Sequence, residues 1–148
     1  MNGLAFFDTK LLVYADDRSA PKKRDVAIEL FARHLHNGTA VILLQVMQEY
    51  FVAATRKLKV APDLPQRKVE ILTRARVVRF APSDVIAAIE LHRLTQITFR
   101  GAMIVQAARL AGVAVLYSED LQAAALAGGV RVVNPFAQPA PPTPASGS

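Results

Sequence analysis

The chain has 148 residues, of which 52% are hydrophobic, so its size and composition suit one domain with an apolar core. It has no cysteine, which excludes disulfide bonds and thiolate metal sites and agrees with a reducing cytoplasm. Its 18 lysines and arginines against 12 acids give a net charge of +6, which favours polyanions such as RNA. Solvated helix faces or an acidic protein partner would account for the same charges.

The longest apolar stretch, "AVILLQVMQEYFVAA", is interrupted by Gln45, Gln48 and Glu49, so the sequence predicts no membrane span. The first residues lack a basic leader, and Asp8 stands where a signal peptide needs an unbroken apolar run. We therefore expect a cytoplasmic location.

The first predicted element is a strand in "LAFFD", residues 4–8, which ends at a carboxylate. The apolar residues around Asp8, from Phe6 to Val13, have the composition of a buried strand. Burying Asp8 among them would cost several kcal/mol unless another group paired with its charge. We therefore expect this carboxylate to have a partner.

Helices and strands alternate along the rest of the chain. Apolar residues at helical spacing predict helices over 21–38, 45–58, 66–75, 83–95 and 98–112. Ser83 and Thr98 are the expected N-caps of the last two helices, and Gly112 is the expected stop. Short apolar runs predict strands over 39–44, 76–80, 113–117 and 130–136.

This alternation predicts a parallel sheet with helices on both of its faces, an α/β fold. In such sheets ligands collect at the carboxyl ends of the strands, which is where chemistry is expected. Residues 137–148 are rich in proline and alanine and carry no charge, so they cannot bury a core. We expect one domain over residues 1–136 and a disordered tail over 137–148.

Acidic residues follow the predicted strands. Asp8 ends the first strand, Glu49 lies about one turn into the helix after the second, and Glu119 and Asp120 follow "VAVLYS". Carboxylates that converge repel each other and stay ionised only around cations, and carboxylate oxygens suit Mg²⁺ or Mn²⁺. On a basic protein such a site indicates phosphodiester hydrolysis by metal-activated water.

Each acid also has a purely structural interpretation. Asp8 would suit the cap of the turn after the first strand, and Glu49 would suit pairing with an arginine. Asp120 would suit the N-cap of a helix beginning "LQAAAL". The histidines match no metal-ligand spacing and look like surface helix residues: His34, His36 and His92. A Gly-x-Ser-x-Gly element is missing, so acyl transfer has no support.

Several quoted segments carry a family resemblance by their order and spacing: "FFDTKLLVYA", "ILLQVMQEY", "TFRGAMIVQAARLAG", "VLYSEDLQ" and "VRVVNPF". Together they resemble the PIN-domain family, and within it the VapC-type ribonuclease toxins of type II toxin–antitoxin systems, over about residues 4–136. The resemblance implies a PIN-like three-layer α/β/α sandwich around a central parallel sheet. It also implies RNA cleavage with Mg²⁺ or Mn²⁺, a homodimer, and neutralisation by a cognate antitoxin protein.

The resemblance assigns roles to single residues. Asp8, Glu49 and Asp120 match the family's catalytic acids, and Asp8 and Asp120 would bind the metal. Thr9 matches the threonine beside the first acid, and Glu119 is a supporting acid.

The chain departs from the family pattern next to these acids. Lys10 stands where the family has asparagine, and Arg100 and Gly101 stand in "FRGA" where the family has "FWDA", so an acid is lost. Both changes oppose divalent-cation binding, because charges about 4 Å apart interact by about 4 kcal/mol at an effective dielectric of about 20. Lys10 would neutralise Asp8 without a metal, or its stem would carry the charge into water. Glu119 would replace the lost acid.

These departures leave two hypotheses open. The first is a metal-dependent endoribonuclease built on Asp8, Glu49 and Asp120, with its activity weakened or lost. The second is a degenerate, non-catalytic module that binds RNA or an antitoxin, with a Lys10–Asp8 contact in place of the metal. In either case Arg100 or Lys10 would be available to hold an RNA phosphate.

Overall fold

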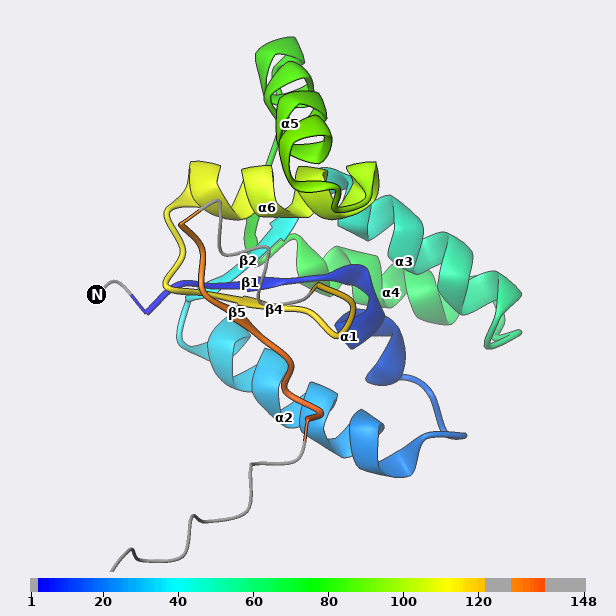
Figure 1. Cartoon of the computed structure of the whole chain (residues 1–148). Helices are drawn as coiled ribbons and strands as arrows, with labels where there is room; N and C mark the ends of the chain where they lie inside the picture. The colour runs from blue at the N-terminus through cyan, green and yellow to red at the C-terminus, as the bar shows by residue number, and fades with distance from the viewer. Residues whose placement is uncertain (1–2, 122–128, 138–148) are drawn as a thin grey trace, which may run out of the picture.

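The computed structural model describes residues 3–121 and 129–137, and these form a sheet between layers of helices (Figure 1). The five strands are all parallel and lie in the order β3-β2-β1-β4-β5. Their bounds are β1 Ala5–Phe7, β2 Ala40–Leu43, β3 Arg76–Val78, β4 Val115–Tyr117 and β5 Val132–Val133. The helices are α1 Thr9–Tyr14, α2 Pro21–His36, α3 Leu44–Arg56, α4 Asp63–Leu72, α5 Pro82–Thr95 and α6 Phe99–Ala111.

Helix α6 covers one face of the sheet and α2 covers the other, while α1, α3 and α4 lie toward the carboxyl ends of the strands (Figure 1). Helix α5 packs on α6 and projects away from the body. The predicted α/β/α sandwich is therefore confirmed, and it places the ends of β1 and β4 beside the first turns of α1 and α3.

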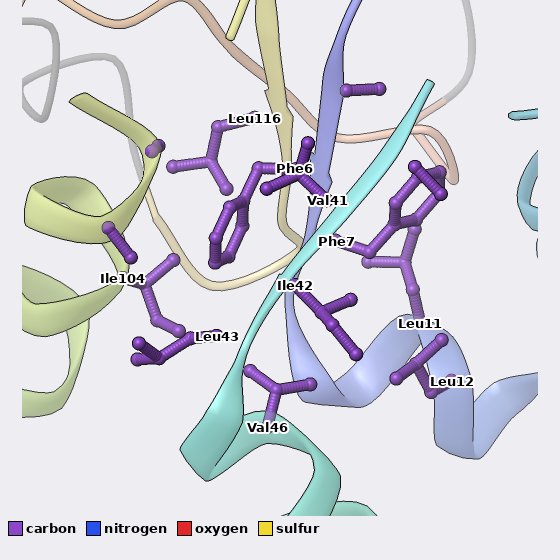
Figure 2. Close-up of a cluster of buried hydrophobic side chains, with 14 of the residues drawn as sticks. Phe6, Phe7, Leu11, Leu12, Val41, Ile42, Leu43, Val46, Ile104 and Leu116 are labelled. Carbon is purple, nitrogen blue, oxygen red and sulfur yellow. The ribbon is translucent and has the colours of Figure 1, made fainter. Parts of the chain in front are cut away.

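The central strand β1 anchors the core through side chains that alternate between the two faces of the sheet. Phe6 points toward Ile104 of α6, and Phe7 points to the opposite face (Figure 2). There the ring of Phe7 meets Phe31 of α2 edge to face, at 5.1 Å between centroids. Both phenylalanines of β1 are fully buried, which stabilises the fold by about 1.5–3 kcal/mol for each side chain.

The predicted strand does end at Asp8, and the segment after it is a helix although its apolar residues have the composition of a buried strand. Asp8 has extended backbone angles and is the N-cap of α1, because its carboxylate accepts a hydrogen bond from the backbone N–H of Thr9 at 2.7 Å. Helix α1 then buries Leu11 and Leu12 in the core. A short apolar run does not distinguish strand from helix, and here the cap decides. The interpretation of Asp8 as a cap is confirmed.

Other helix boundaries differ from the expected ones where proline enters the first turn. Helix α4 begins at Asp63, so Pro65 lies inside its first turn. Helix α5 begins at Pro82, so its N-cap is Ala81 and the expected N-cap Ser83 is wrong; the Asp84 carboxylate accepts from the Ala81 N–H.

The predicted ends of α6 are confirmed. Thr98 accepts a hydrogen bond from the Gly101 N–H at 3.0 Å, and Gly112 ends the helix with φ of +64°.

Two expectations fall mainly on residues 122–128 and 138–148, which the structure does not describe: the helix "LQAAAL" that Asp120 would cap, and the disordered tail. Among residues 3–121 and 129–137, no helix is long and apolar enough to cross a membrane.

Candidate functional site

The predicted acids gather at the carboxyl end of the sheet, beside a cleft of about 1000 Å³. The cleft is bordered by α1, the loop after it, α3 and the first turn of α6. Its lining includes Thr9, Lys10, Tyr14, Glu49, Arg100 and Asp120.

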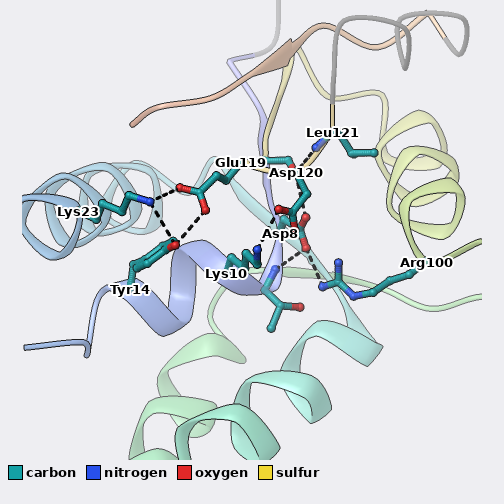
Figure 3. Close-up of polar contacts among 10 residues, drawn as sticks. Asp8, Lys10, Tyr14, Lys23, Arg100, Glu119, Asp120 and Leu121 are labelled. Atoms are coloured by element: carbon teal, nitrogen blue, oxygen red, sulfur yellow. Dashed lines mark hydrogen bonds and ion pairs between the residues drawn. The ribbon is translucent and has the colours of Figure 1, made fainter. Parts of the chain in front are cut away.

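Asp8 is only 2% exposed, and each of its carboxylate oxygens is engaged. Besides the cap bond to Thr9, Oδ1 accepts from Nη2 of Arg100 at 2.9 Å, and Oδ2 accepts from the hydroxyl of Ser118 at 2.9 Å (Figure 3). Ser118 is itself fully buried at the end of β4. The buried charge therefore has a partner, as expected, and this partner is the guanidinium of Arg100. The neutral hydroxyl of Ser118 adds a hydrogen bond.

Arg100 joins Asp8 to a second acid. Its Nε donates to Oε2 of Glu49 at 2.7 Å, so one planar guanidinium bridges the N-cap of α1 and the second turn of α3. The other oxygen of Glu49 accepts from the hydroxyl of Thr9 at 3.3 Å. Burial lowers the pKa of Arg100, but Asp8 and Glu49 outweigh that effect and the net shift is upward. The interpretation of Glu49 as an arginine partner is confirmed.

Lys10 pairs with Asp120 at 2.9 Å, and the expected Lys10–Asp8 contact is wrong. Lys10 is the second residue of α1, and its side chain extends outward to a pair whose members are 44% and 46% exposed. The hydrogen bond to Asp120 is the largest cause of a raised pKa of Lys10. Asp8 is thus paired with Arg100 of α6, and Asp120 is paired with Lys10 of α1.

Glu119 belongs to a separate cluster with Lys23 and Tyr14. The ammonium of Lys23 lies 2.5 Å from one carboxylate oxygen, and the hydroxyl of Tyr14 donates to the other at 2.9 Å (Figure 3). Burial pushes the pKa of Glu119 up, but these two bonds outweigh it and lower the pKa overall. Both carboxylate oxygens of Glu119 therefore bind Lys23 and Tyr14 and do not face Asp8. Glu119 does not replace the lost acid in this arrangement.

Gly101 occupies the position of the lost acid, and Leu121 packs against it. A Cβ atom at Gly101 would lie 2.9 Å from Cδ2 of Leu121 and 3.1 Å from the hydroxyl of Thr98. A larger side chain at this position would require Leu121 to move, so the space beside Gly101 is filled by an apolar methyl group.

A further polar network includes Asp16, which lines the cleft. Tyr50 donates a short hydrogen bond to Asp16, and Lys68 contacts Asp16 at 3.3 Å and the carbonyl of Leu12 at 3.1 Å. The Lys68 ammonium also lies 5.0 Å from the centre of the Tyr50 ring. Burial lowers the pKa of Lys68, against the opposing effect of Asp16. The network fixes the loop after α1 to α3 and α4.

The family model of the PIN domain matches residues 5–129 of the chain. The chain belongs to the PIN-domain family. No curated protein matches the sequence.

Solved structures share the fold of this PIN domain at low sequence identity. A toxin–antitoxin complex from Klebsiella pneumoniae is 21% identical with a TM-score of 0.63, covering 89% of this chain and 98% of that one. VapC20 from Mycobacterium tuberculosis, a sarcin–ricin loop cleaving toxin, is 17% identical with a TM-score of 0.66, covering 85% and 95%. FitAcB from Neisseria gonorrhoeae is 15% identical with a TM-score of 0.67, covering 90% and 99%. These structures confirm the PIN fold of this chain over most of its length.

The acids of this PIN domain do not fit a divalent metal in their present arrangement. Mg²⁺ and Mn²⁺ need carboxylate oxygens as ligands, whereas one oxygen each of Asp8 and Glu49 binds the guanidinium of Arg100. Asp120 forms an ion pair with Lys10. Across the described residues, no group of three or more acidic, histidine or cysteine side chains is placed to hold a metal ion.

Sequence reasoning missed several residues that complete this site of the PIN domain. Ser118 stands in "LYSED", directly before the acids, and its position at a strand end was the available signal. Lys23 stands within a basic run, and nothing in its spacing pointed to Glu119. The Tyr50–Asp16–Lys68 network joins three segments that no local pattern connects.

Proposed function

We propose that this PIN domain is a toxin-type module that binds RNA and whose nuclease centre is held closed by its own basic side chains. The observation that supports this is the bridge from Arg100 to Asp8 and Glu49, together with the Lys10–Asp120 pair. Oxygens that would be metal ligands in a PIN nuclease here accept hydrogen bonds from cations. We therefore expect RNA binding with cleavage that is weak or absent.

The cleft offers cations for a polyanion. Arg18 and Lys57 line it, and neither forms an ion pair with an acid among the residues that the structure describes. Phosphate groups could reach them without breaking an existing contact, and the net charge of +6 would attract the polymer. RNA, rather than DNA, is taken from the family resemblance. Arg100 and Lys10 would add phosphate contacts only on release of their acids.

The test measures binding and cleavage on the same labelled single-stranded RNA. Fluorescence anisotropy in chelator should show salt-dependent binding by the parent, weakened in Lys57→Ala and Arg18→Ala. Loss of one phosphate contact should reduce the slope of log K against log salt by about 0.7. Arg109→Ala, which removes an exposed charge from α6 outside the cleft, is the matched control.

Cleavage is followed on denaturing gels with Mg²⁺ or Mn²⁺. We expect intact RNA with the parent. Cutting by the parent that chelator and Asp8→Asn both abolish would contradict the proposal, and so would equal RNA binding by the parent and the double variant Arg18→Ala/Lys57→Ala.

The second candidate function is a metal-dependent endoribonuclease. The observation that favours it is that Glu49 and Asp120 line one cleft and that Asp8 lies directly behind Arg100, which binds both Asp8 and Glu49. The hydroxyl of Thr9 donates to Glu49. In this candidate the three acids would be catalytic, and Thr9 and Glu119 would support them. Asp8 and Asp120 would hold Mg²⁺ or Mn²⁺ only after release from Arg100 and Lys10, and the ion would supply activated water. The gel assay above decides between the two candidates.

The proposed partner protein is a cognate antitoxin, because structures with the same fold include a toxin–antitoxin complex. A homodimer and a cytoplasmic location remain predictions. Size-exclusion chromatography with light scattering would test the homodimer, and co-purification with the protein of an adjacent reading frame would test the antitoxin.

A further inference from the structure

We propose that Arg100 is a built-in counter-ion that takes the place of a divalent cation in this chain, holding Asp8 and Glu49 together and keeping a metal out. The proposal concerns the site of the proposed function and rests on its closed state. It goes further by naming one residue as the switch between a guanidinium site and a metal site.

The first step is geometric. Two different nitrogens of one guanidinium bind two carboxylates, at 2.9 Å to Asp8 and 2.7 Å to Glu49. These acids are 41 positions apart in sequence and belong to different helices, so a single cation joins α1 to α3. A metal ion bound by the same oxygens would make the same connection.

The second step is the local structure that directs the side chain of Arg100 toward Asp8 and Glu49. Its backbone lies in the first turn of α6, which the Thr98 hydroxyl caps through the Gly101 N–H. Gly101 has no side chain, and Leu121 fills the adjacent space with its Cδ2 atom only 2.9 Å from where a Cβ would stand. The turn therefore presents an arginine to the acids and leaves no room for an extra carboxylate without a shift of Leu121.

The third step is charge. Asp8, Glu49 and Asp120 carry three negative charges, and Arg100 and Lys10 carry two positive ones. A divalent ion added to this set would reverse the sign of the site and meet a guanidinium at contact distance. Without Arg100 two negative charges remain uncompensated, which is the charge that Mg²⁺ or Mn²⁺ neutralises.

The experiment compares the parent with Arg100→Gln, which keeps a polar side chain at this position but removes the guanidinium and its charge. Arg109→Gln is the matched control, because Arg109 is exposed on the same helix and forms no ion pair with a described residue. Thermal unfolding is recorded in EDTA and in millimolar Mn²⁺, and Mn²⁺ binding is measured by calorimetry. No RNA is present, so the result is independent of whether the protein binds or cuts RNA.

We expect the melting temperatures of the parent and of Arg109→Gln to be the same in EDTA and in Mn²⁺. Arg100→Gln should melt earlier in EDTA, regain stability in Mn²⁺, and bind Mn²⁺ at least about tenfold more tightly than the parent. The double variant Asp8→Asn/Arg100→Gln, which no longer buries an unpaired charge, should fold in EDTA and lose the Mn²⁺ response.

Three results would overturn the proposal. One is tight Mn²⁺ binding by the parent that Asp8→Asn removes. Another is an Arg100→Gln protein that gains neither stability nor Mn²⁺ affinity, including one that stays unfolded in Mn²⁺. The third is an Mn²⁺ response in Arg100→Gln that survives the further Asp8→Asn change, because the ion would then bind elsewhere.

Discussion

The guanidinium of Arg100 lies 2.9 Å from the carboxylate of Asp8, across 92 positions of sequence, and it compensates a charge that is only 2% exposed. This contact sets the electrostatic character of the whole strand-end site. Glu49 shares the same cation, while Asp120 and Glu119 each have a lysine partner. Every acid assigned to the site is thus paired within the chain.

The first prediction is an asymmetry between the partners of this ion pair. Breaking a buried pair costs about 3–5 kcal/mol, and because Arg100 is 37% exposed we expect Arg100→Gln to cost about 2–3 kcal/mol. Asp8→Asn should cost less, since the amide oxygen can keep a hydrogen bond to the Thr9 N–H. Urea unfolding of both single variants and the double variant should show a clearly non-additive total. Additive losses would mean that the pair contributes no coupling.

The second prediction concerns the Lys10–Asp120 pair, which is exposed on both sides. Exposed pairs contribute about 0–1 kcal/mol, so Lys10→Gln should change the free energy of unfolding by less than about 1 kcal/mol. The small effect should disappear at high salt, because exposed charges are screened. Urea unfolding at low and high salt tests this directly. A loss as large as that of Arg100→Gln would show that Lys10 is a structural counter-ion as well.

Most of the fold could be predicted from the sequence because its signals are local. The run "AVIL" predicts a strand, and Thr98 and Gly112 predict the two ends of a helix, without reference to distant parts of the chain. The structure confirms the strand and both helix ends. The convergence of Asp8 and Glu49 at one sheet edge was expected because each follows a predicted strand of a parallel sheet. Helix α1 could not be predicted, because its six residues are too short for a periodic signal and its start depends on a cap.

The pairing of cations with acids could not be read from the sequence. Lys10 stands two positions from Asp8 but binds Asp120, 110 positions away, while Arg100 from α6 takes Asp8. The direction of a side chain at a helix start depends on the neighbouring elements, which a motif does not encode. Spacing identified the charged residues, and only the three-dimensional arrangement identified their partners.

The third prediction addresses Gly101. Alanine is a better helix residue than glycine by up to about 1 kcal/mol, but its Cβ would collide with Leu121 Cδ2 at 2.9 Å. The two effects should roughly cancel, so Gly101→Ala alone should leave the melting temperature nearly unchanged. When Leu121 is replaced by alanine, its Cδ2 atom no longer blocks the new Cβ. Gly101→Ala/Leu121→Ala should therefore be more stable than Leu121→Ala alone. An equal or lower stability of the double variant would locate the strain at Thr98, whose hydroxyl would lie 3.1 Å from the new atom.

The fourth prediction is a pH dependence that arises at His34. Its ring lies 5.6 Å from that of Phe7 and 6.0 Å from that of Tyr117, and its Nδ1 is 2.7 Å from the Thr39 hydroxyl. Burial, and then the charge of Arg33, lowers the pKa of His34 below its ordinary value of 6.5. The unfolded chain therefore takes up this proton first as the pH falls, and the free energy of unfolding must decrease below about pH 6.5.

His34→Phe fills the same aromatic contact without a titrating group. Urea unfolding between about pH 7 and pH 5 should show a smaller loss of stability in this variant than in the parent. His36→Phe, at an exposed position of the same helix, controls for the added ring. The lowered pKa of Glu119 gives its own loss only below about pH 4.5, where the unfolded chain protonates this carboxylate before the folded protein does, so the two effects separate along the pH scale. Equal losses in the parent and His34→Phe between these pH values would assign the dependence to another group.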